Sequence, residues 1–378
     1  MTTYIDIHAL QTVPPSNINR DDTGAPKSAQ FGGVRRARVS SQAWKRATRA
    51  EFNSHLDQSE LGERTMFVAE RIAEAITRKD GNLSDKAEDM AVEVLKATGL
   101  KVEKPKPKDG VDEAELRWKT QYLVFVSRAQ IEKLADLAIA AAEEGKAVPK
   151  KEAKAALNDD HSIDVALFGR MIADAADLNV DACCQVSHAI SVHAVSNEFD
   201  YFTAVDDNAA EDNLGAGMIG TVEFNSSTLY RYANVNADEL AASLGSVEAA
   251  ARAVEAFVKA FVVSMPTGKQ NTFANRTLPD LVVVRVRGDQ PVNLAEAFEN
   301  AIEGTDGRTK KAAIALGRYS EQLDGAYTGP AEAGGYLATG GAAELGVWTA
   351  QQEAFGERVN LDGLAQLAAQ AVQDRVTM

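Results

Sequence analysis

Strand-like patterns at both ends of a long helical stretch are the feature that most limits the possible fold. Residues 3–10 alternate, with Ile5, Ile7 and Ala9 on one side, which is the period of a half-buried strand. From about 51 to 184 the sequence is rich in Ala, Glu and Lys, and its pattern is mostly helical. Strand-like segments return after residue 185. The chain therefore predicts a sheet whose strands come from both sides of a helical insertion.

The second part of the chain alternates between strand and helix patterns. Strands are predicted at 198–205, 221–236 and 280–288, and helices at about 246–264 and near 293–303. A first strand, a helical unit, paired strands, a helix and a last strand are typical of a ferredoxin-like sheet of the RNA-recognition type, so the predicted fold class is α+β. The stretch between Ala204 and Val222 is rich in Gly, Asp and Asn and too long for a tight turn, which predicts a protruding hairpin or a flexible loop.

Composition and the N-terminus indicate a cytoplasmic globular protein. The 378 residues, 45% of them hydrophobic, suit one large domain or two closely packed domains. No apolar run reaches the ~18–20 residues that span a bilayer, and MTTYIDIHAL has neither region of a secretory signal. Cys183 and Cys184 are adjacent and have no CxxC partner. We expect them to be buried, inert thiols rather than a disulfide or a zinc site.

The charge of the chain is unevenly distributed. The net charge is -15, which by itself argues against binding a polyanion. Segment 17–49, however, contains eight basic residues and only two acids, Asp21 and Asp22. A basic patch on an acidic body can bind a polyanion locally. The eight basic residues are Arg20, Lys27, Arg35, Arg36, Arg38, Lys45, Arg46 and Arg49.

Several features of FGGVRRARVSSQAWKRATR suit a polyphosphate. Gly32 and Gly33 allow close approach of a backbone, and the arginines that follow offer forked donors for phosphate oxygens. RRARVSS predicts a short strand that leads into a helix with Ser40 or Ser41 as its N-cap, where the helix dipole favours an anion. The face of that helix opposite Trp44 and Ala47 presents Gln42, Lys45, Arg46 and Arg49. A solvated basic face is the alternative interpretation.

The sequence does not indicate an active site, a metal site or a cofactor. His188 and His193 are five residues apart, so on a helix or a strand they point in different directions and do not form a metal-ligand pair. No phosphate-binding glycine loop and no nucleophile elbow is present. The acid pairs could hold Mg²⁺, but adjacent aspartates in polar loops are typical of turns and caps. These pairs are Asp21–Asp22, Asp159–Asp160 and Asp206–Asp207.

An ordered set of short motifs resembles a known family. The motifs are NRDD at 19–22, FGG at 31–33, RVSSQAWKRA at 38–47, FGRM at 168–171, SHAI at 187–190, FTAVDD at 202–207 and YRYANVN at 230–236. Together they resemble the CasC-type backbone subunit of the type I-E Cascade, the CRISPR antiviral surveillance complex. The resemblance extends from the first strand to at least Val286.

The resemblance implies a hand-shaped, non-catalytic RNA-binding protein. Residues 1–55 and 185–378 would form a palm of the RNA-recognition type, 56–184 helical fingers, and 200–224 a thumb hairpin. Copies of the subunit would stack head-to-tail along a guide RNA, and each thumb would displace one nucleotide at regular spacing. The expected partners are the guide RNA, target DNA, neighbouring copies, the large, small and guide-processing subunits and, indirectly, the recruited helicase-nuclease. No cofactor and no membrane is implied.

The resemblance also implies roles for individual residues. Residues expected to hold the guide backbone are Arg20, Lys27, Ser40, Gln42, Lys45, Arg46 and Arg49, with Lys269 and Gln270 as a further stretch near the RNA. Met171 would be an apolar wedge beside the displaced nucleotide. Residues expected in the thumb are Phe202, Thr203, Met218 and Ile219. A lysine cluster would guide duplex DNA or, equally, be a solvated helix face, and it consists of Lys146, Lys150, Lys151 and Lys154.

Two departures and two alternative functions bear on this hypothesis. Val34 follows FGG where some relatives have a basic residue, and the first strand lacks the aromatics that stack bases in ordinary RNA-recognition domains, which favours capture of the backbone. Related type III backbone subunits cut target RNA with a loop aspartate, so a metal-dependent endoribonuclease that uses Asp206 or Asp207 is the first alternative. A structural subunit whose basic patch meets acidic protein partners is the second alternative.

Overall fold

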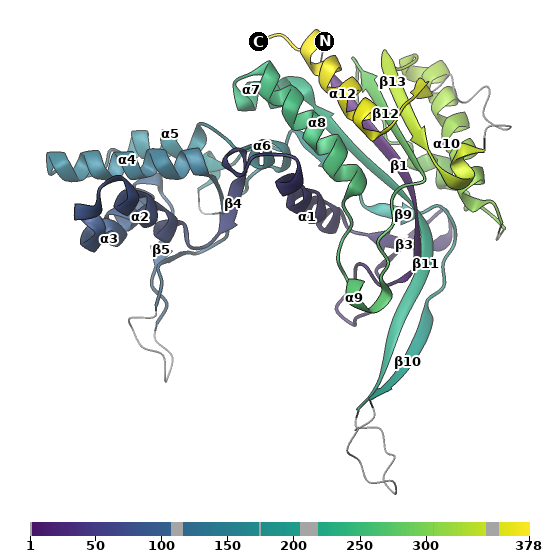
Figure 1. Cartoon of the computed structure of the whole chain (residues 1–378), viewed down its shortest axis with the longest axis horizontal. Helices are drawn as coiled ribbons and strands as arrows, with labels where there is room; N and C mark the ends of the chain where they lie inside the picture. The colour runs from purple at the N-terminus through teal and green to yellow at the C-terminus, as the bar shows by residue number, and fades with distance from the viewer. Residues whose placement is uncertain (1, 107–115, 174, 205–217, 305, 345–354) are drawn as a thin grey trace, which may run out of the picture. The chain divides into compact units, whose positions relative to one another are not determined.

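The chain has a mixed α+β fold, and the structure is a computed structural model (Figure 1). It describes residues 2–106, 116–173, 175–204, 218–304, 306–344 and 355–378. Contacts divide the chain into two compact units. The first contains Met1–His55, Gln185–Asp238 and Ala251–Thr377, and the second contains Leu56–Cys184 and Glu239–Ala250. Every helix in the described ranges is too short or too polar to cross a lipid bilayer.

The first unit is built on one large mixed sheet. Its strand order is β14-β13-β12-β1-β11-β9-β3-β2, and β8 and β10 also pair with β11. These strands are β1 (Tyr4–Ser16), β2 (Ser28–Phe31), β3 (Val34–Val39), β8 (Cys184–Val186), β9 (Ala189–Ser191), β10 (Glu198–Ala204), β11 (Met218–Asn236), β12 (Leu281–Arg287), β13 (Ala333–Ala338) and β14 (Glu357–Arg358). The predicted strands at 3–10, 198–205, 221–236 and 280–288 are therefore confirmed.

Strand β1 lies in the middle of this sheet and is buried on both faces. It runs antiparallel to β11 and to β12, with Ile7 opposite Ala233 on one side and opposite Val284 on the other. The expectation of a half-buried strand was wrong, because Asp6 and His8 are as fully buried as Ile5 and Ile7. Residues 251–263 of α8 (Val247–Val263) and helix α12 (Leu361–Arg375) lie on one side of the sheet, and α10 (Arg308–Leu323) lies on the other (Figure 1).

Ion pairs and hydrogen bonds compensate the polar side chains under α10. The Asp6 carboxylate accepts hydrogen bonds from the Tyr232 hydroxyl at 2.8 Å and from the Val292 backbone N–H at 3.0 Å. Arg285 and Arg287 both pair with Asp324, which follows the end of α10. Buried polar groups that are paired in this way no longer have to be solvated by water. The alternation of residues 3–10 therefore marks two different buried faces rather than one buried and one exposed face.

Arg231 connects helix α1 (Ser41–Glu51) to the face of the sheet that α10 does not cover. Its guanidinium lies 3.7 Å from the centre of the Trp44 ring and 4.5 Å from that of Phe261, and it donates to Gln11 at 2.6 Å. The Thr48 hydroxyl of α1 lies 3.3 Å from the Ser264 hydroxyl. These contacts turn the other side of α1 outward, and that side carries the predicted polar face.

One predicted helix is wrong, and several helices of this unit had no sequence prediction. Near 293–303 the structure has only the single 3-10 turn Ala295–Phe298. The backbone carbonyls of Phe298 and Glu299 accept hydrogen bonds from the Arg36 guanidinium, at 2.8 and 3.0 Å, instead of continuing a helical ladder. Helices α10 and α12 complete the unit, together with α7 (Ala237–Leu244), of which Ala237 and Asp238 belong here, and the short α9 (Gln270–Phe273).

Strands β10 and β11 form a long hairpin that extends beyond the body of the sheet (Figure 1). The pairing runs from Glu198 opposite Phe224 to Ala204 opposite Met218. An added Cβ on Gly220 would lie 2.4 Å from the Phe202 ring, so this ring covers the glycine. The connecting residues 205–217 lie outside the described residues, and with them Asp206 and Asp207.

The second unit is a helical bundle with two short antiparallel strand pairs, β4 with β7 and β5 with β6. Its elements are β4 (Gly62–Thr65), α2 (Val68–Lys79), α3 (Ala87–Thr98), β5 (Val102–Glu103), β6 (Lys119–Thr120), β7 (Val124–Ser127), α4 (Arg128–Glu144), α5 (Lys150–Asn158) and α6 (Ile163–Phe168). Helices α2 to α5 share one apolar core, which includes Ile72, Leu95, Leu134 and Leu157. A capping box of Ser127 and Gln130 begins α4, and Gly145 in the left-handed conformation ends it.

Candidate nucleic-acid interface

The N-terminus of α1 presents backbone donors that suit an anion. Ser40 is its N-cap, as predicted, and its hydroxyl accepts a hydrogen bond from the Ala43 N–H at 3.3 Å. Within the part of the chain that the structure describes, the backbone N–H groups of Ser41 and Gln42 have no acceptor. Such groups, together with the helix dipole, favour a negatively charged ligand.

The segment that precedes the basic strand folds back over this helix terminus. The Asn19 side-chain oxygen accepts a hydrogen bond from the Ser40 N–H at 2.8 Å. The Asp21 carboxylate accepts from the Thr23 N–H, the Thr23 hydroxyl and the Ala25 N–H at 2.7–3.0 Å, and these hydrogen bonds lower its pKa. Asp21 therefore closes a turn, as the interpretation of the acid pairs predicted, and this turn places Arg20 beside α1.

A second loop, Met265–Arg276, forms the other wall. Gly268 packs directly on the first segment, since an added Cβ there would lie 2.3 Å from the Ile18 carbonyl oxygen. Lys269 and Ala274, on either side of α9, have the left-handed φ values 51° and 48°, which are uncommon for residues with a side chain. The close packing and this backbone conformation fix Lys269 and Gln270 opposite α1.

The two walls enclose a groove of about 760 Å³, which we call the basic groove. Its polar and charged lining comes from residues of both walls and of α1: Asn19, Arg20, Ser40, Gln42, Arg46, Glu51, Ser264, Thr267, Lys269, Gln270, Asn275 and Arg276. Six of the predicted RNA-binding residues therefore share one groove. Asn19 and Arg276 were missed, because neither an amide beside NRDD nor a lone arginine in a loop is distinctive in sequence.

Most cations of this region lack a carboxylate partner. Among the residues that the structure describes, no carboxylate lies within ion-pair distance of Arg20, Lys45, Arg46 or Lys269. Arg276 is the exception, because it lies 3.7 Å from Glu51. Cations without an acidic neighbour keep a positive potential that attracts phosphate.

Other predicted cations continue this surface along β2 and β3. Lys27 and Arg38 line a small hollow next to the basic groove, and the Lys27 carbonyl oxygen accepts from the Arg38 N–H at 2.9 Å. The Arg38 guanidinium also lies 3.2 Å from Nδ1 of His188, an exposed residue. Arg35 is exposed on β3. No local pattern predicts His188 at this place, since 150 residues separate it from Arg38.

Arg36 does not belong to this surface, which corrects the expectation that it donates to phosphate. It is completely buried, and its guanidinium donates to the carbonyl oxygens of Phe31, Ser191, Phe298 and Glu299 at 2.8–3.1 Å. Burial lowers its pKa. A strand directs neighbouring side chains to opposite faces, so Arg35 and Arg36 cannot both face a ligand on one side.

The other candidate residues lie outside the basic groove. Met171 belongs to the second unit and is 83% exposed. Phe202 and Thr203 lie on the β10 arm of the hairpin, opposite Gly220 and Ile219, and Met218 begins the β11 arm. In the lysine cluster, Lys146 lies 2.9 Å from Glu144 and Lys154 lies 2.5 Å from Asp177, whereas Lys150 and Lys151 are exposed at the start of α5.

His193, the two cysteines and Asp160, which the sequence offered as catalytic or metal-binding candidates, are buried or paired with other protein groups. The described residues contain no cluster of three or more His, Cys, Asp or Glu that could hold a metal ion. His193 is buried, and its ring bonds to the Ala194 carbonyl oxygen and the Thr228 N–H. Cys183 and Cys184 are buried, as predicted, and burial raises the pKa of Cys183 to about 12. Asp160 pairs with Lys133 at 2.5 Å.

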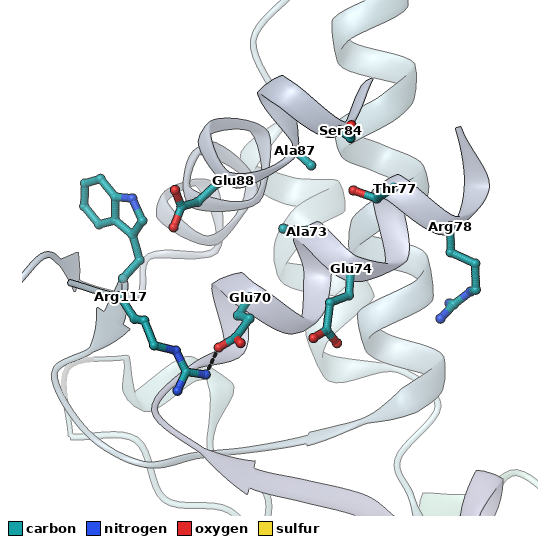
Figure 2. A pocket seen from close by; sticks show the side chains of 10 residues that line it. Glu70, Ala73, Glu74, Thr77, Arg78, Ser84, Ala87, Glu88 and Arg117 are labelled. Carbon is teal, nitrogen blue, oxygen red and sulfur yellow. Dashed lines mark hydrogen bonds and ion pairs between the residues drawn. The ribbon is translucent and has the colours of Figure 1, made fainter. Parts of the chain in front are cut away.

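A second hollow, of about 650 Å³, lies in the second unit between α2 and α3, and we call it the α2–α3 hollow (Figure 2). Its charged residues are Glu70, Glu74, Arg78, Glu88 and Arg117. Figure 2 shows the ion pair of Arg117 with Glu70 at its rim. Because carboxylates outnumber arginines here, this hollow does not favour a polyanion.

Comparisons with known proteins agree with this geometry. The sequence matches the family described as CT1975-like protein over residues 5–366. A solved structure described as "CRISPR RNA-guided surveillance complex, pre-nicking" contains a chain that is 36% identical, with a TM-score of 0.82, and the match covers 98% of this chain and 100% of that one. A second solved structure, described as "CRISPR RNA-guided surveillance complex", contains a chain that is 32% identical, with a TM-score of 0.72. That match covers 97% of this chain and 99% of the other. No curated protein matches. The family match spans nearly the whole chain, which therefore belongs to the CT1975-like proteins.

Proposed function

We propose that this chain is a non-catalytic backbone subunit that binds the guide RNA of a CRISPR surveillance complex. The observation that carries the proposal is the basic groove, in which predicted RNA-binding residues from three segments line one space. The full-length similarity to chains of RNA-guided surveillance complexes supports the same role. The motif resemblance further specifies the type I-E Cascade, several copies along each guide, and target DNA that pairs with the exposed bases.

The groove suits capture of the RNA backbone rather than recognition of bases. Its donors are guanidinium, ammonium and amide groups and the N-terminus of α1, all of which bind phosphate oxygens. Phosphate contacts carry no sequence information, so such a groove accepts any guide sequence. This property is what a subunit needs if it must hold guides with different spacers.

The strand order supports a palm of the RNA-recognition type. Strands β12, β1, β11 and β9 are adjacent in this order, and each neighbouring pair is antiparallel. Helix α1 precedes β9 in the chain, and α8 lies between β11 and β12. This order supports a ferredoxin-like sheet, in which two split β-α-β units interlock. In the proposal, the second unit contains the fingers, and the β10–β11 hairpin is the thumb.

The remaining partners follow from the same proposal. The exposed Lys150 and Lys151 are the better candidates to guide duplex DNA, because Lys146 and Lys154 already pair with carboxylates. The large, small and guide-processing subunits and neighbouring copies would complete a cytoplasmic ribonucleoprotein. The recruited helicase-nuclease would act on DNA that this complex has bound.

The test is the mass and nucleic-acid content of the protein purified with a repeat–spacer transcript, compared with the protein expressed alone. We expect a particle that contains several copies and one protected RNA, and whose mass grows with spacer length. A target RNA paired to the bound guide should remain uncut when Mg²⁺ is added. A stable monomer without nucleic acid in both preparations would contradict the proposal, and cleavage of RNA paired to the guide would favour the endoribonuclease that uses Asp206 or Asp207.

A further inference from the structure

One turn of the second unit presents an exposed apolar side chain between two buried residues. Met171 is 83% exposed, whereas its neighbours Arg170 and Ile172 are 4% and 2% exposed. A methionine has three rotatable bonds and gains nothing from exposure to water. Its exposure between two buried neighbours therefore suits contact with another molecule.

The guanidinium of Arg170 is surrounded by neutral oxygens from three parts of the unit. It donates to the Leu178 carbonyl at 2.9 Å, the Leu157 carbonyl at 3.0 Å, the Asn158 side-chain oxygen at 3.0 Å and the Phe125 carbonyl at 3.4 Å. Burial lowers the pKa of Arg170 to about 10, so it remains charged at neutral pH. Carbonyl and amide oxygens of the protein therefore replace water around this charge. Moving the side chain would break several hydrogen bonds at once.

The backbone on both sides of Met171 is also fixed. Arg170 and Val180 exchange two backbone hydrogen bonds of 2.9 and 2.8 Å. On the other side, the Ile172 N–H donates to the Asn179 side-chain oxygen at 2.6 Å. Gly169 has a φ of 76°, and an added Cβ would lie 2.8 Å from the Val180 carbonyl oxygen. Only glycine fits there without strain.

We propose that Arg170 is a positioning residue that holds the Met171 backbone in place, so that the Met171 side chain forms a fixed apolar projection against the guide RNA. The inference rests on the proposed function and on the motif resemblance, which implies that Met171 lies beside the displaced nucleotide. A wedge that acts at regular spacing must sit at the same place in every copy. Arg170 supplies this constancy because its four acceptors belong to α5, β7 and the segment after Ala175.

Hydrogen exchange of the protein without RNA tests the anchoring. We expect Arg170→Met to raise exchange at the amides of Ile172 and Val180 by about tenfold or more, while the amides of α3 keep their protection. Arg170→Lys should give an intermediate increase, because one ammonium cannot reach acceptors on several sides. Asn179→Ala provides a milder variant if Arg170→Met does not fold, since Asn179 is exposed and its loss releases only the Ile172 amide.

Acylation of guide 2′-hydroxyls in the assembled complex tests whether a fixed Met171 side chain shapes the guide RNA. With the wild-type subunit we expect peaks of reactivity at regular spacing, at the displaced nucleotides. Arg170→Met and Met171→Ala should both reduce the contrast of these peaks at least about threefold without changing the number of copies per guide. The matched control is Arg36→Met, which removes an equally caged arginine from the other unit and should keep the contrast.

The two measurements separate this inference from the proposed function. Wild-type exchange rates and sharp peaks in both Arg170→Met and Asn179→Ala would overturn the role of Arg170. A wild-type complex that binds no RNA would overturn the proposed function, and a guide without periodic peaks would overturn the contact between Met171 and a displaced nucleotide. In either case the exchange data still decide whether Arg170 anchors the turn.

Discussion

The basic groove and the α2–α3 hollow have similar volumes and both contain arginines, but they differ in how those arginines are paired. In the basic groove, Arg20 and Arg46 have no carboxylate within ion-pair distance among the described residues. In the hollow, Arg117 pairs with Glu70 and Arg78 with Glu132. An exposed ion pair contributes little to stability and cancels the potential of its cation. Arginines that lack a carboxylate partner, rather than the number of arginines, therefore distinguish the surface that suits RNA.

The buried Arg36 differs from the exposed arginines of both surfaces, whether these are paired or not. Its replacement should have the largest effect, and that effect is on stability. Arg36→Met would leave four carbonyl oxygens without their donor, so we expect the free energy of unfolding to fall by about 3 kcal/mol. Urea unfolding measures this change. The control is Arg35→Met on the same strand, where the side chain is exposed and the expected loss is below about 0.5 kcal/mol. Equal losses would mean that the buried cage does not stabilise the sheet.

The next effect concerns RNA affinity and contrasts the unpaired arginines of the basic groove with paired arginines of the second unit. Replacing both Arg20 and Arg46 by alanine should weaken guide binding roughly tenfold at ~0.15 M salt, because two phosphate contacts are lost. The slope of the logarithm of the binding constant against the logarithm of salt concentration should fall by about 1.4, or ~0.7 for each contact on a single strand. Fluorescence anisotropy over a salt series measures both values.

The control for that prediction is a pair of arginines from the second unit. Arg71 pairs with Glu63 at 2.7 Å, and Arg78 pairs with Glu132. Replacing both by alanine removes the same formal charge from the chain, so a nonspecific charge effect would appear in both double variants. We expect the affinity and the slope to remain at wild-type values. A similar loss in the two double variants would show that RNA responds to net charge rather than to the basic groove.

Asn19 should have a smaller effect, because it shapes the groove without adding charge. Asn19→Ala would leave the nearly buried Ser40 N–H without its acceptor, at a cost of about 1 kcal/mol in unfolding free energy. Guide affinity should fall a few-fold with an unchanged salt slope, because Arg20 would be less firmly placed while the number of phosphate contacts stays the same. Asn82→Ala, which removes an exposed amide bonded to Asp80, is the control and should change neither quantity. A reduced salt slope would instead mean that Asn19 helps to hold a phosphate contact.

Sequence reasoning found the elements of the groove but not the way they meet. The strand at 3–10, the N-cap Ser40 and the polar face of α1 follow from local patterns, and the structure confirms them. The alternation of apolar and polar residues in 3–10 showed that Asp6 and Ile7 point to different faces of the sheet. It did not show that α10 covers the face that carries Asp6. Arg36 and Arg35 are adjacent and chemically identical, so only the three-dimensional contacts separate a structural cation from an exposed one. Asn19 and His188 act on partners that are 21 and 150 residues away, which no local period reports.

The smallest expected effect tests whether the basic surface extends to His188. In the protein without RNA, partial desolvation by neighbouring groups, followed by the charges of Arg38 and Lys27, lowers the pKa of this exposed histidine. A phosphate bound between these cations would raise the pKa again, so binding takes up protons and affinity should fall as pH rises through the histidine range. We expect guide affinity to decrease a few-fold between pH 6 and pH 8, and His188→Gln to remove this dependence while it keeps a hydrogen-bond acceptor for Arg38. The salt slope of the wild-type protein should be steeper at the lower pH, because a protonated His188 adds one cation. If the pH profile of His188→Gln matches that of the wild-type protein, the RNA does not reach β9, and the basic surface ends at Arg38.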